Sequence, residues 1–301
     1  MEDNMNHMTK TGIERLTADH WEDYAFPIET VPIKANVHDD PSGDIPIPDR
    51  VALIRSDTNE YLATHSLQYR PVLHQDVVMP VMNILDRISK NYHVNVRMHD
   101  NGALMVAKFT CKDILIEDPS LNDYIAYQIT LRNSYNGMWS VMINAYGLRM
   151  FCMNECTTPD KIANFKLKHN GIFNYNFDHL EHSLDVFRNS EAKYKAWHKQ
   201  SVADTVATML FEKICYSARP TIDGKHYNAT QVYNLERLWS QYKSEMGRTV
   251  WSLYNTVTHW ASHPTEVSRP EKTKVERNNA FTKYLQHNNN IFIDTQEVIN
   301  V

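Results

Sequence analysis

Two histidines four residues apart are the first residues whose type and spacing could support chemistry. His259 and His263 lie in the segment THWASH, and their spacing places both imidazoles on one face of a helix, where two nitrogens could bind a metal. The segment lacks the glutamate of an HExxH site, and two ligands do not complete a metal site. Because a histidine near the end of a helix more often contacts the last carbonyl groups, we expect no metal. An enzyme that uses this pair ranks third among the functions considered.

Cysteines and glycines add no catalytic motif. Cys152 and Cys156 could be soft metal ligands or a redox pair, but cysteines flanked by apolar residues are typical of buried positions. The eight glycines form neither a GxGxxG nor a GxxxxGK[ST] loop, and GxSxG and CxxC motifs are absent as well. We therefore expect a protein that is not an enzyme, has no cofactor and does not depend on ATP.

Basic residues interleaved with aromatic residues favour a binding function instead. The stretch LRNSYNGMWSVMINAYGLRMFCMNEC, residues 131–156, has an arginine on each side of an Asn-Gly turn signal. Phosphate contacts need cations, and sequence-independent binding of a single strand also needs flat rings on which bases stack. We predict a DNA-binding surface formed by Arg97, Lys108, Arg132, Asn133, Tyr135, Tyr146, Arg149, Asn154, Lys161, Lys166 and Lys168. The alternative interpretation is that these are ordinary solvated bases and half-buried aromatic residues.

The strands of this hairpin must position those residues. Apolar and polar residues alternate along its first strand, with Ile125, Tyr127, Ile129 and Leu131 on one face and Gln128, Thr130 and Arg132 on the other. This alternation predicts one packed face and one solvated face. Gly147 in the second strand predicts a bulge that turns Arg149 toward the solvated face. Arg132 and Arg149 would then share one surface.

Turn and capping signals outline the remaining elements. The segment 51–66 predicts a first hairpin, and Asn101-Gly102 predicts the turn of a second one. Apolar residues at helical spacing predict one helix between these hairpins and a series of helices after residue 177. One of the later helices is expected to begin at Asn228, and another is expected to end before Pro264.

The fold class that these elements predict is α+β: an antiparallel sheet of successive hairpins with a packed helix, followed by a helical C-terminal part. Residues 1–49 are rich in proline and show no sustained period, so we expect an extended acidic arm. Residues 50–156 would form the antiparallel β-hairpin domain with its one helix. Residues 157–290 would form the helical part packed on the sheet, and residues 291–301 would form a tail.

Charge is distributed unevenly along the chain. Residues 1–60 hold 13 acidic and 5 basic residues, a balance of −8, and the whole chain carries −5, which leaves +3 for residues 61–301. A mildly basic body can bind phosphate groups if its basic residues cluster. The acidic arm would either compete for the same groove or keep the protein soluble.

The sequence also bears on the compartment. Its start is polar and acidic where a signal peptide needs a charged cap and an apolar stretch, and nowhere do eighteen apolar residues run together. The four cysteines are sparse for 301 residues, which fits a reducing compartment. We expect a cytoplasmic protein that does not contact a membrane.

Three segments resemble successive signatures of a phage and plasmid protein family described as domain of unknown function 932. They are RSDTNEYLATHSLQYRPV near residues 55–72, RNSYNGMWSVMINAYGLRMFCMNEC, and WSLYNTVTHWASH near residues 251–263. The matching positions are Asp57-Thr58, Tyr69, Asn133 to Gly137, and Arg149, Cys152 and Asn154. The resemblance implies a source in a phage or mobile element, but the family has no settled activity.

A second resemblance concerns the fold alone. The order of hairpin, helix, hairpin, long hairpin and helix is similar to that of single-strand annealing proteins of the Rad52 and phage recombinase type. This resemblance implies homo-oligomeric rings or filaments in which a basic groove holds one strand while a complementary strand pairs with it, without ATP.

Our leading hypothesis is a phage or mobile-element protein that binds single-stranded DNA and promotes strand annealing in recombination. Arg132 and Arg149 would contact phosphates, and Asn133 and Asn154 would either fix the hairpin or touch DNA. The second hypothesis is a non-catalytic, protein-binding phage factor for counter-defence or host takeover, which the acidic arm and the net negative charge favour.

Overall fold

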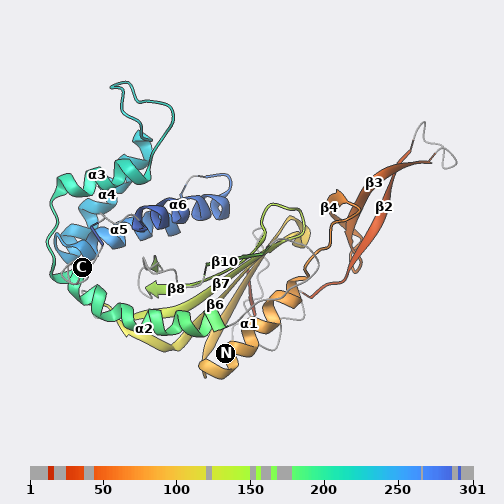
Figure 1. Cartoon of the computed structure of the whole chain (residues 1–301), viewed down its shortest axis with the longest axis horizontal. Helices are drawn as coiled ribbons and strands as arrows, with labels where there is room; N and C mark the ends of the chain where they lie inside the picture. The colour runs from red at the N-terminus through yellow and green to blue at the C-terminus, as the bar shows by residue number, and fades with distance from the viewer. Residues whose placement is uncertain are drawn as a thin grey trace, which may run out of the picture. The chain divides into compact units, whose positions relative to one another are not determined.

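The computed structural model describes residues 13–16, 25–36, 44–119, 124–149, 154–156, 164–167, 178–265, 267–286 and 291–292. Two sheets come first along the chain, with one helix between their strands, and five helices follow (Figure 1). The predicted α+β class, with antiparallel hairpins followed by a helical part, is confirmed.

The larger sheet has the strand order β1-β5-β6-β7-β8-β10, and β9 pairs with β8 beside this path. Its strands are β1 (Ile13–Leu16), β5 (Tyr92–His99), β6 (Leu104–Glu117), β7 (Tyr124–Ser134), β8 (Val141–Arg149), β9 (Asn154–Cys156) and β10 (Asn164–Leu167). The two predicted turns lie where consecutive strands meet. Asn101 and Gly102 have φ values of 57° and 96°, and Gly137 has a φ of 74°, the left-handed conformation that such turns require.

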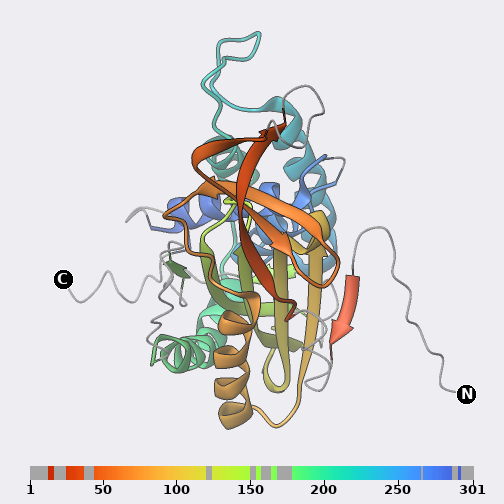
Figure 2. The same ribbon diagram turned by 90° about the vertical axis from the view of Figure 1, so that its right-hand side faces the viewer.

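The smaller sheet has the order β2-β3-β4 and consists of β2 (Ile28–Asn36), β3 (Asp44–Arg55) and β4 (Glu60–Ser66). Much of it lies in the segment expected as an extended arm, so that residues 28–36 and 44–49 are strands of a hairpin. Strand β4 pairs only with residues 50–55 of β3. The hairpin therefore extends beyond β4 as two strands alone (Figures 1 and 2). We call residues 33–36 and 44–49 the distal hairpin.

Helix α1 (His74–Ile88) is the predicted helix between the first two hairpins. Its buried positions include Val77, Val81 and Leu85, four residues apart, which is the spacing that places side chains on one helical face. Its first residue, His74, is also buried and belongs to the hydrogen-bond network described below.

The later helices are α2 (Asp178–Lys199), α3 (Asp204–Ile214), α4 (Ala229–Met246), α5 (Val250–Ser262) and α6 (Pro270–Leu285). The predicted start of α4 is confirmed, because the Asn228 side chain accepts a hydrogen bond of 3.2 Å from the backbone N–H of Gln231. Helix α5 ends two residues before Pro264, as predicted. None of the helices in the described ranges is sufficiently long and apolar to cross a membrane.

The chain forms two compact units. Unit 1 comprises residues 1–114, 128–145 and 163–181, and unit 2 comprises residues 115–127, 146–162 and 182–301. Aromatic residues dominate the core of unit 2, where Trp197, Tyr254 and Phe292 are fully buried. Phe292 falls in the segment predicted as a tail, and its ring packs 5.4 Å from that of Trp197. The rest of that segment, residues 293–301, lies outside the described residues.

Candidate nucleic-acid interface

Strand register brings three of the predicted cations onto one face of the larger sheet. Asn95 of β5 pairs with Lys108 of β6, and Arg97 pairs with Val106; directly paired residues project to the same face. The Gln128 amide of β7 donates a hydrogen bond of 2.6 Å to the Thr110 hydroxyl of β6. Because alternate residues of a strand share a face, Arg97, Lys108 and Arg132 lie on one side. We call His93, Asn95, Arg97, Lys108, Thr110, Gln128, Thr130 and Arg132 the polar sheet face.

Exposure falls steeply across this face. Arg97 and Lys108 are half-buried, whereas Gln128, Thr130 and Arg132 on β7 are 3%, 0% and 3% exposed. The prediction that Arg132 lies on a solvated face is therefore wrong. Strand β7 is central in the sheet, and every residue from Ile125 to Ser134 is buried. Its polar side chains are enclosed by protein, as the Gln128 to Thr110 hydrogen bond illustrates, and water does not solvate them.

The two predicted stacking platforms are also buried. Tyr135 is 1% exposed and Tyr146 is 4% exposed, so neither ring presents a face on which a base could stack. Trp139, expected in the core, is buried against Leu104 and Val106. The predicted role of the two tyrosines in base stacking is therefore wrong.

The remaining predicted residues can be placed only by their backbone or lie outside the described residues. Arg149 and Asn154 are register partners at the ends of β8 and β9, and Lys166 of β10 pairs with Met142 of β8. Lys161 and Lys168 lie outside the described residues, as does Cys152. Gly147 pairs with Cys156, within the strand pairing that links β8 to β9.

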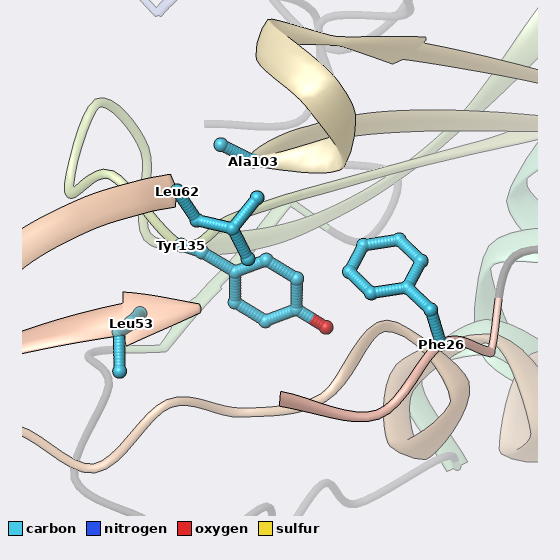
Figure 3. Packing of buried hydrophobic residues seen from close by; sticks show 5 residues of the cluster. All are labelled: Phe26, Leu53, Leu62, Ala103 and Tyr135. Carbon is cyan, nitrogen blue, oxygen red and sulfur yellow. The ribbon is translucent and has the colours of Figure 1, made fainter. Parts of the chain in front are cut away.

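Asn133 and Tyr135 belong to a buried cluster at the turns of the two hairpins of the larger sheet. Figure 3 shows the Tyr135 ring between Leu62 and Phe26, with Leu53 and Ala103 beside it. The Tyr135 hydroxyl accepts a hydrogen bond of 2.8 Å from the backbone N–H of His74. We call these residues, with His65, Tyr69, Gly102 and Asn133, the turn cluster.

The Asn133 side chain connects three segments of the turn cluster. Its amide nitrogen lies 2.9 Å from the Val72 carbonyl oxygen and 2.9 Å from His74 Nδ1. On the far side of the same imidazole, Nε2 lies 2.9 Å from the Gly102 carbonyl oxygen. The carbonyl can only accept, so Nε2 carries the proton and Nδ1 accepts from Asn133. Asn133 is 0% exposed, so of its two predicted roles the structure assigns the fixing of the hairpin.

Two further rings close the turn cluster. His65 and Tyr69 stack with ring centroids 3.7 Å apart, and His65 Nε2 donates to the Tyr135 carbonyl oxygen at 2.5 Å. Burial raises the pKa of Tyr69 to about 12 and raises the pKa of Tyr135 well above its ordinary value. Neither phenol ionises near neutral pH, which excludes both as general bases.

Arg55 links the dipeptide Asp57-Thr58 to the turn cluster, because its guanidinium contacts both Asp57 and Phe26. The Arg55 guanidinium binds both carboxylate oxygens of Asp57 at 2.7 and 3.0 Å and lies 4.0 Å from the centroid of the Phe26 ring. The hydrogen bond from Arg55 lowers the pKa of Asp57. Three of the positions that carry the family resemblance, Asp57, Tyr69 and Asn133, therefore meet at the turn cluster. They come from two of the three segments that resemble the family.

The histidine pair of α5 does not form a metal site with other described residues. His259 Nδ1 lies 2.9 Å from the Tyr242 hydroxyl, and the ring centroids of His259 and His263 are 4.6 Å apart. Burial and the neighbouring His263 lower the pKa of His259 to about 4. Within the described ranges no three His, Cys, Asp or Glu residues gather in a way that could hold a metal ion.

A surface that sequence reasoning missed lies on α3 and the loop that follows it, residues 215–228. A shallow groove of about 470 Å³ is lined by Met209, Lys213, Tyr216, Lys225, His226 and Tyr227, among others. Backbone pairing holds the two sides of this loop together. Tyr216 and Tyr227 form an isolated antiparallel β-bridge, and the Ser217 N–H donates a hydrogen bond of 3.2 Å to the His226 carbonyl oxygen. The loop projects from the helices in both views (Figures 1 and 2). We call this site the α3 groove.

Asp204 holds α3 beside α4 and so fixes one wall of the α3 groove. Its carboxylate accepts a hydrogen bond of 2.8 Å from Trp239 Nε1 and lies within 3.3 Å of Lys243 and Arg248. The Trp239 hydrogen bond and these cations lower the pKa of Asp204. A sequence signal for the groove exists, because α3 carries exposed Val206 and Met209 opposite its buried stripe. Apolar residues on both faces of a short helix indicate a second contact surface.

The fold and these surfaces describe an α+β protein with a polar face on its larger antiparallel sheet. A family model described as Domain of unknown function (DUF932) matches residues 61–282. The chain belongs to this family, and the predicted membership is confirmed. No curated protein and no solved structure matches the chain. The fold-level resemblance to annealing proteins is thus not supported by any structural neighbour.

Proposed function

We propose that this protein binds single-stranded DNA and promotes ATP-independent strand annealing during recombination of a phage or other mobile element. In this proposal, the polar sheet face binds the DNA strand. The observation that carries it is the pairing of β5 with β6, which sets half-exposed Arg97 and Lys108 on neighbouring strands of one face. Cations so placed can contact successive phosphates of one strand.

Neighbouring side chains suit the same ligand. His93, Asn95 and Thr110 are partly exposed on this face, and each can hydrogen-bond a phosphate oxygen. Arg132 is enclosed and would support the sheet without touching the strand.

Burial of the aromatic residues bears on annealing. With Tyr135 and Tyr146 enclosed, the polar sheet face offers contacts to the phosphate backbone and none of the predicted base-stacking platforms. A strand held by its backbone keeps its bases accessible to a complementary strand. The sequence has no phosphate-binding nucleotide loop, in keeping with a reaction that base pairing alone drives.

The test measures annealing of two complementary oligonucleotides without ATP, for the natural protein and for the double variant Arg97→Glu/Lys108→Glu. Arg237→Glu/Lys283→Glu is the matched control, because it reverses two exposed charges on α4 and α6. We expect the natural protein and the control to accelerate annealing, and the double variant to lose most of the acceleration while unfolding at the same temperature. Absence of acceleration by the natural protein, or full acceleration by the double variant, would overturn the proposal.

A non-catalytic protein-binding role is the second candidate. It is favoured by solvent-exposed apolar side chains. Among them, Ile45 is 56%, Met209 is 59% and Tyr216 is 70% exposed. Large exposed apolar residues in groups mark protein contact sites more often than nucleic-acid contact sites. A protein that captures a partner but neither binds nor anneals oligonucleotides would favour this role.

A further inference from the structure

We propose that copies of this chain associate head to tail, with the distal hairpin of one copy seated in the α3 groove of the next. This inference does not depend on DNA binding. It rests on two surfaces that expose apolar side chains. The distal hairpin projects from the smaller sheet, and the α3 groove is a depression beside α3.

The distal hairpin lacks a core of its own. Ile45 and Ile47 are 56% and 40% exposed, and every residue from Asp44 to Arg50 is exposed. A hairpin of two strands is at best marginally stable in water, and a third strand or a packed surface is what normally stabilises it. Strand β4 stops at Ser66, opposite Arg50, and so does not supply a third strand here. A surface on another molecule would complete the packing.

The α3 groove is lined in part by exposed apolar side chains. Met209 and Tyr216 line it with 59% and 70% of their surfaces exposed, and the Tyr216 ring is stacked on His226 at an interplanar angle of 19°. Ile222, at the tip of the adjoining ribbon, is fully exposed. Methionine and tyrosine are enriched where protein surfaces meet, and isoleucine at a ribbon tip suits insertion beside a β-hairpin.

Charge distinguishes a second copy from a nucleic acid as the occupant. The distal hairpin, residues 33–36 and 44–49, contains two acidic residues and one basic residue, a balance of −1. Residues 209–228 contain three basic and two acidic residues, a balance of +1, with Lys213 and Lys225 both lining the groove. The opposite signs favour approach of the hairpin to the groove. A balance of +1, with Lys225 paired at 3.6 Å to Glu212, is too weak for a polyanion.

The geometry of such a contact has a consequence for assembly. The hairpin and the groove are different surfaces of the chain, so each bound copy leaves one hairpin and one groove open. A heterologous contact of this kind continues into a closed ring or an open filament. A self-complementary contact between two hairpins would stop at a dimer.

The experiment measures mass by light scattering over a range of concentrations for the natural full-length chain and two variants. Ile45→Asp/Ile47→Asp alters the hairpin and Met209→Asp/Tyr216→Asp alters the groove, while Leu115→Asp, at a position 41% exposed on β6, is the control. We expect the natural chain and the control to assemble, and each double variant to have the mass of one chain. All four side chains are exposed, so the variants should keep the thermal unfolding midpoint of the natural chain.

Mixing the two variants separates a head-to-tail contact from the alternatives. The hairpin variant keeps its groove and the groove variant keeps its hairpin, so an equimolar mixture should recover a species of two chains. A mixture that stays at the mass of one chain, a natural chain that is monomeric throughout, or double variants that assemble normally would each overturn the proposal. Loss of oligonucleotide binding by the groove variant, with assembly unchanged, would also overturn it and assign the groove to nucleic acid. If assembly behaves as expected but oligonucleotides do not bind, only the proposed function fails.

Discussion

At the scale of single residues, the turn cluster shows how a polar group is kept in a core. The Asn133 amide donates to the Val72 carbonyl and to His74 Nδ1, while the other imidazole nitrogen donates to the Gly102 carbonyl. Each donor meets an acceptor, so the desolvation of the amide nitrogen is compensated, whereas Asn133 Oδ1 is buried without a hydrogen-bond partner among the described residues. The hydrogen bonds hold the start of α1 against both hairpin turns, and the Asn133 turn is one of the segments that carry the family resemblance.

Removing the amide should therefore weaken the fold. Asn133→Ala leaves the Val72 carbonyl and His74 Nδ1 without this donor, and we expect the free energy of unfolding to fall by about 1–3 kcal/mol. Asn136→Ala, at a partly exposed position of the same turn, should cost less. Denaturant titration of both variants provides the measurement. If the Asn133 variant were as stable as the natural protein but bound DNA more weakly, the asparagine would have a binding role and not a structural one.

Gly102 offers a second test within the turn cluster. A Cβ added there would lie 2.6 Å from Phe26 Cζ, on a backbone with φ of +96°, so Gly102→Ala combines backbone strain with a clash. Gly224→Ala is the matched control, because φ is +81° but nothing lies within 4 Å of the added Cβ. We expect a loss of about 1 kcal/mol for Gly224→Ala and a clearly larger loss for Gly102→Ala. Equal losses in thermal unfolding would show that Phe26 moves aside without cost.

Sequence patterns predicted the turn residues well and the exposure of the strand residues badly. Asn101, Gly102 and Gly137 were assigned from local backbone requirements, which need no knowledge of the rest of the fold. Arg132 and Tyr146 were placed at a surface by alternation alone. Alternation separates the two faces of a strand but does not tell whether water or protein covers the polar one, because cross-strand partners such as Thr110 can replace water.

At the scale of elements, α4 and α5 are joined by a histidine that folding keeps neutral. His259 Nδ1 lies 2.9 Å from the Tyr242 hydroxyl, and burial together with the adjacent His263 lowers the pKa of His259 from the ordinary histidine value of 6.5 to about 4. The unfolded chain therefore binds a proton between pH 6.5 and 4 that the folded chain does not bind. Because the unfolded state holds more protons there, stability is full above pH 6.5 and falls as the pH is lowered toward 4.

This linkage predicts a pH-dependent difference between two variants. His259→Gln removes the titration, so its free energy of unfolding should fall less than that of the natural protein between pH 6.5 and 4, by up to about 3 kcal/mol. His179→Gln, at an exposed position on α2, should follow the natural protein. Denaturant titrations at several pH values compare the three. A profile of His259→Gln parallel to that of the natural protein would contradict the assignment.

Helices and hairpins followed from the sequence wherever a local signal existed. The Asn228 cap and the stop before Pro264 are both in place. The β2–β3 hairpin was not predicted, because Pro32, Pro46 and Pro48 indicated an extended arm over residues 1–49. All three lie in the β2–β3 hairpin: Pro32 is in an edge strand where the register shifts, and the other two are in the part of β3 that β4 does not reach. A strand with an open side tolerates a residue that lacks an N–H.

At the scale of the whole molecule, negative and positive charges are concentrated in different regions of the chain. The first 60 residues carry −8 and the rest carry +3, so the cations of the polar sheet face belong to the mildly basic part of the chain. The net charge of the distal hairpin is negative and that of the α3 groove is positive, so the proposed contact between them would bring opposite charges together. A protein with this distribution should respond to salt in two ways, through DNA affinity and through assembly.

The salt dependence of single-stranded DNA affinity tests the central claim most directly. With one phosphate neutralised by each of Arg97 and Lys108, the logarithm of the association constant should fall against the logarithm of the salt concentration with a slope of about −1.4 or steeper. Arg97→Glu/Lys108→Glu should reduce the magnitude of this slope by at least about 1.4, since each lost phosphate contact removes about 0.7, while Arg237→Glu/Lys283→Glu should leave it unchanged. A flat response of the natural protein, or equal slopes for the natural protein and the Arg97/Lys108 variant, would contradict the assignment of the polar sheet face to DNA.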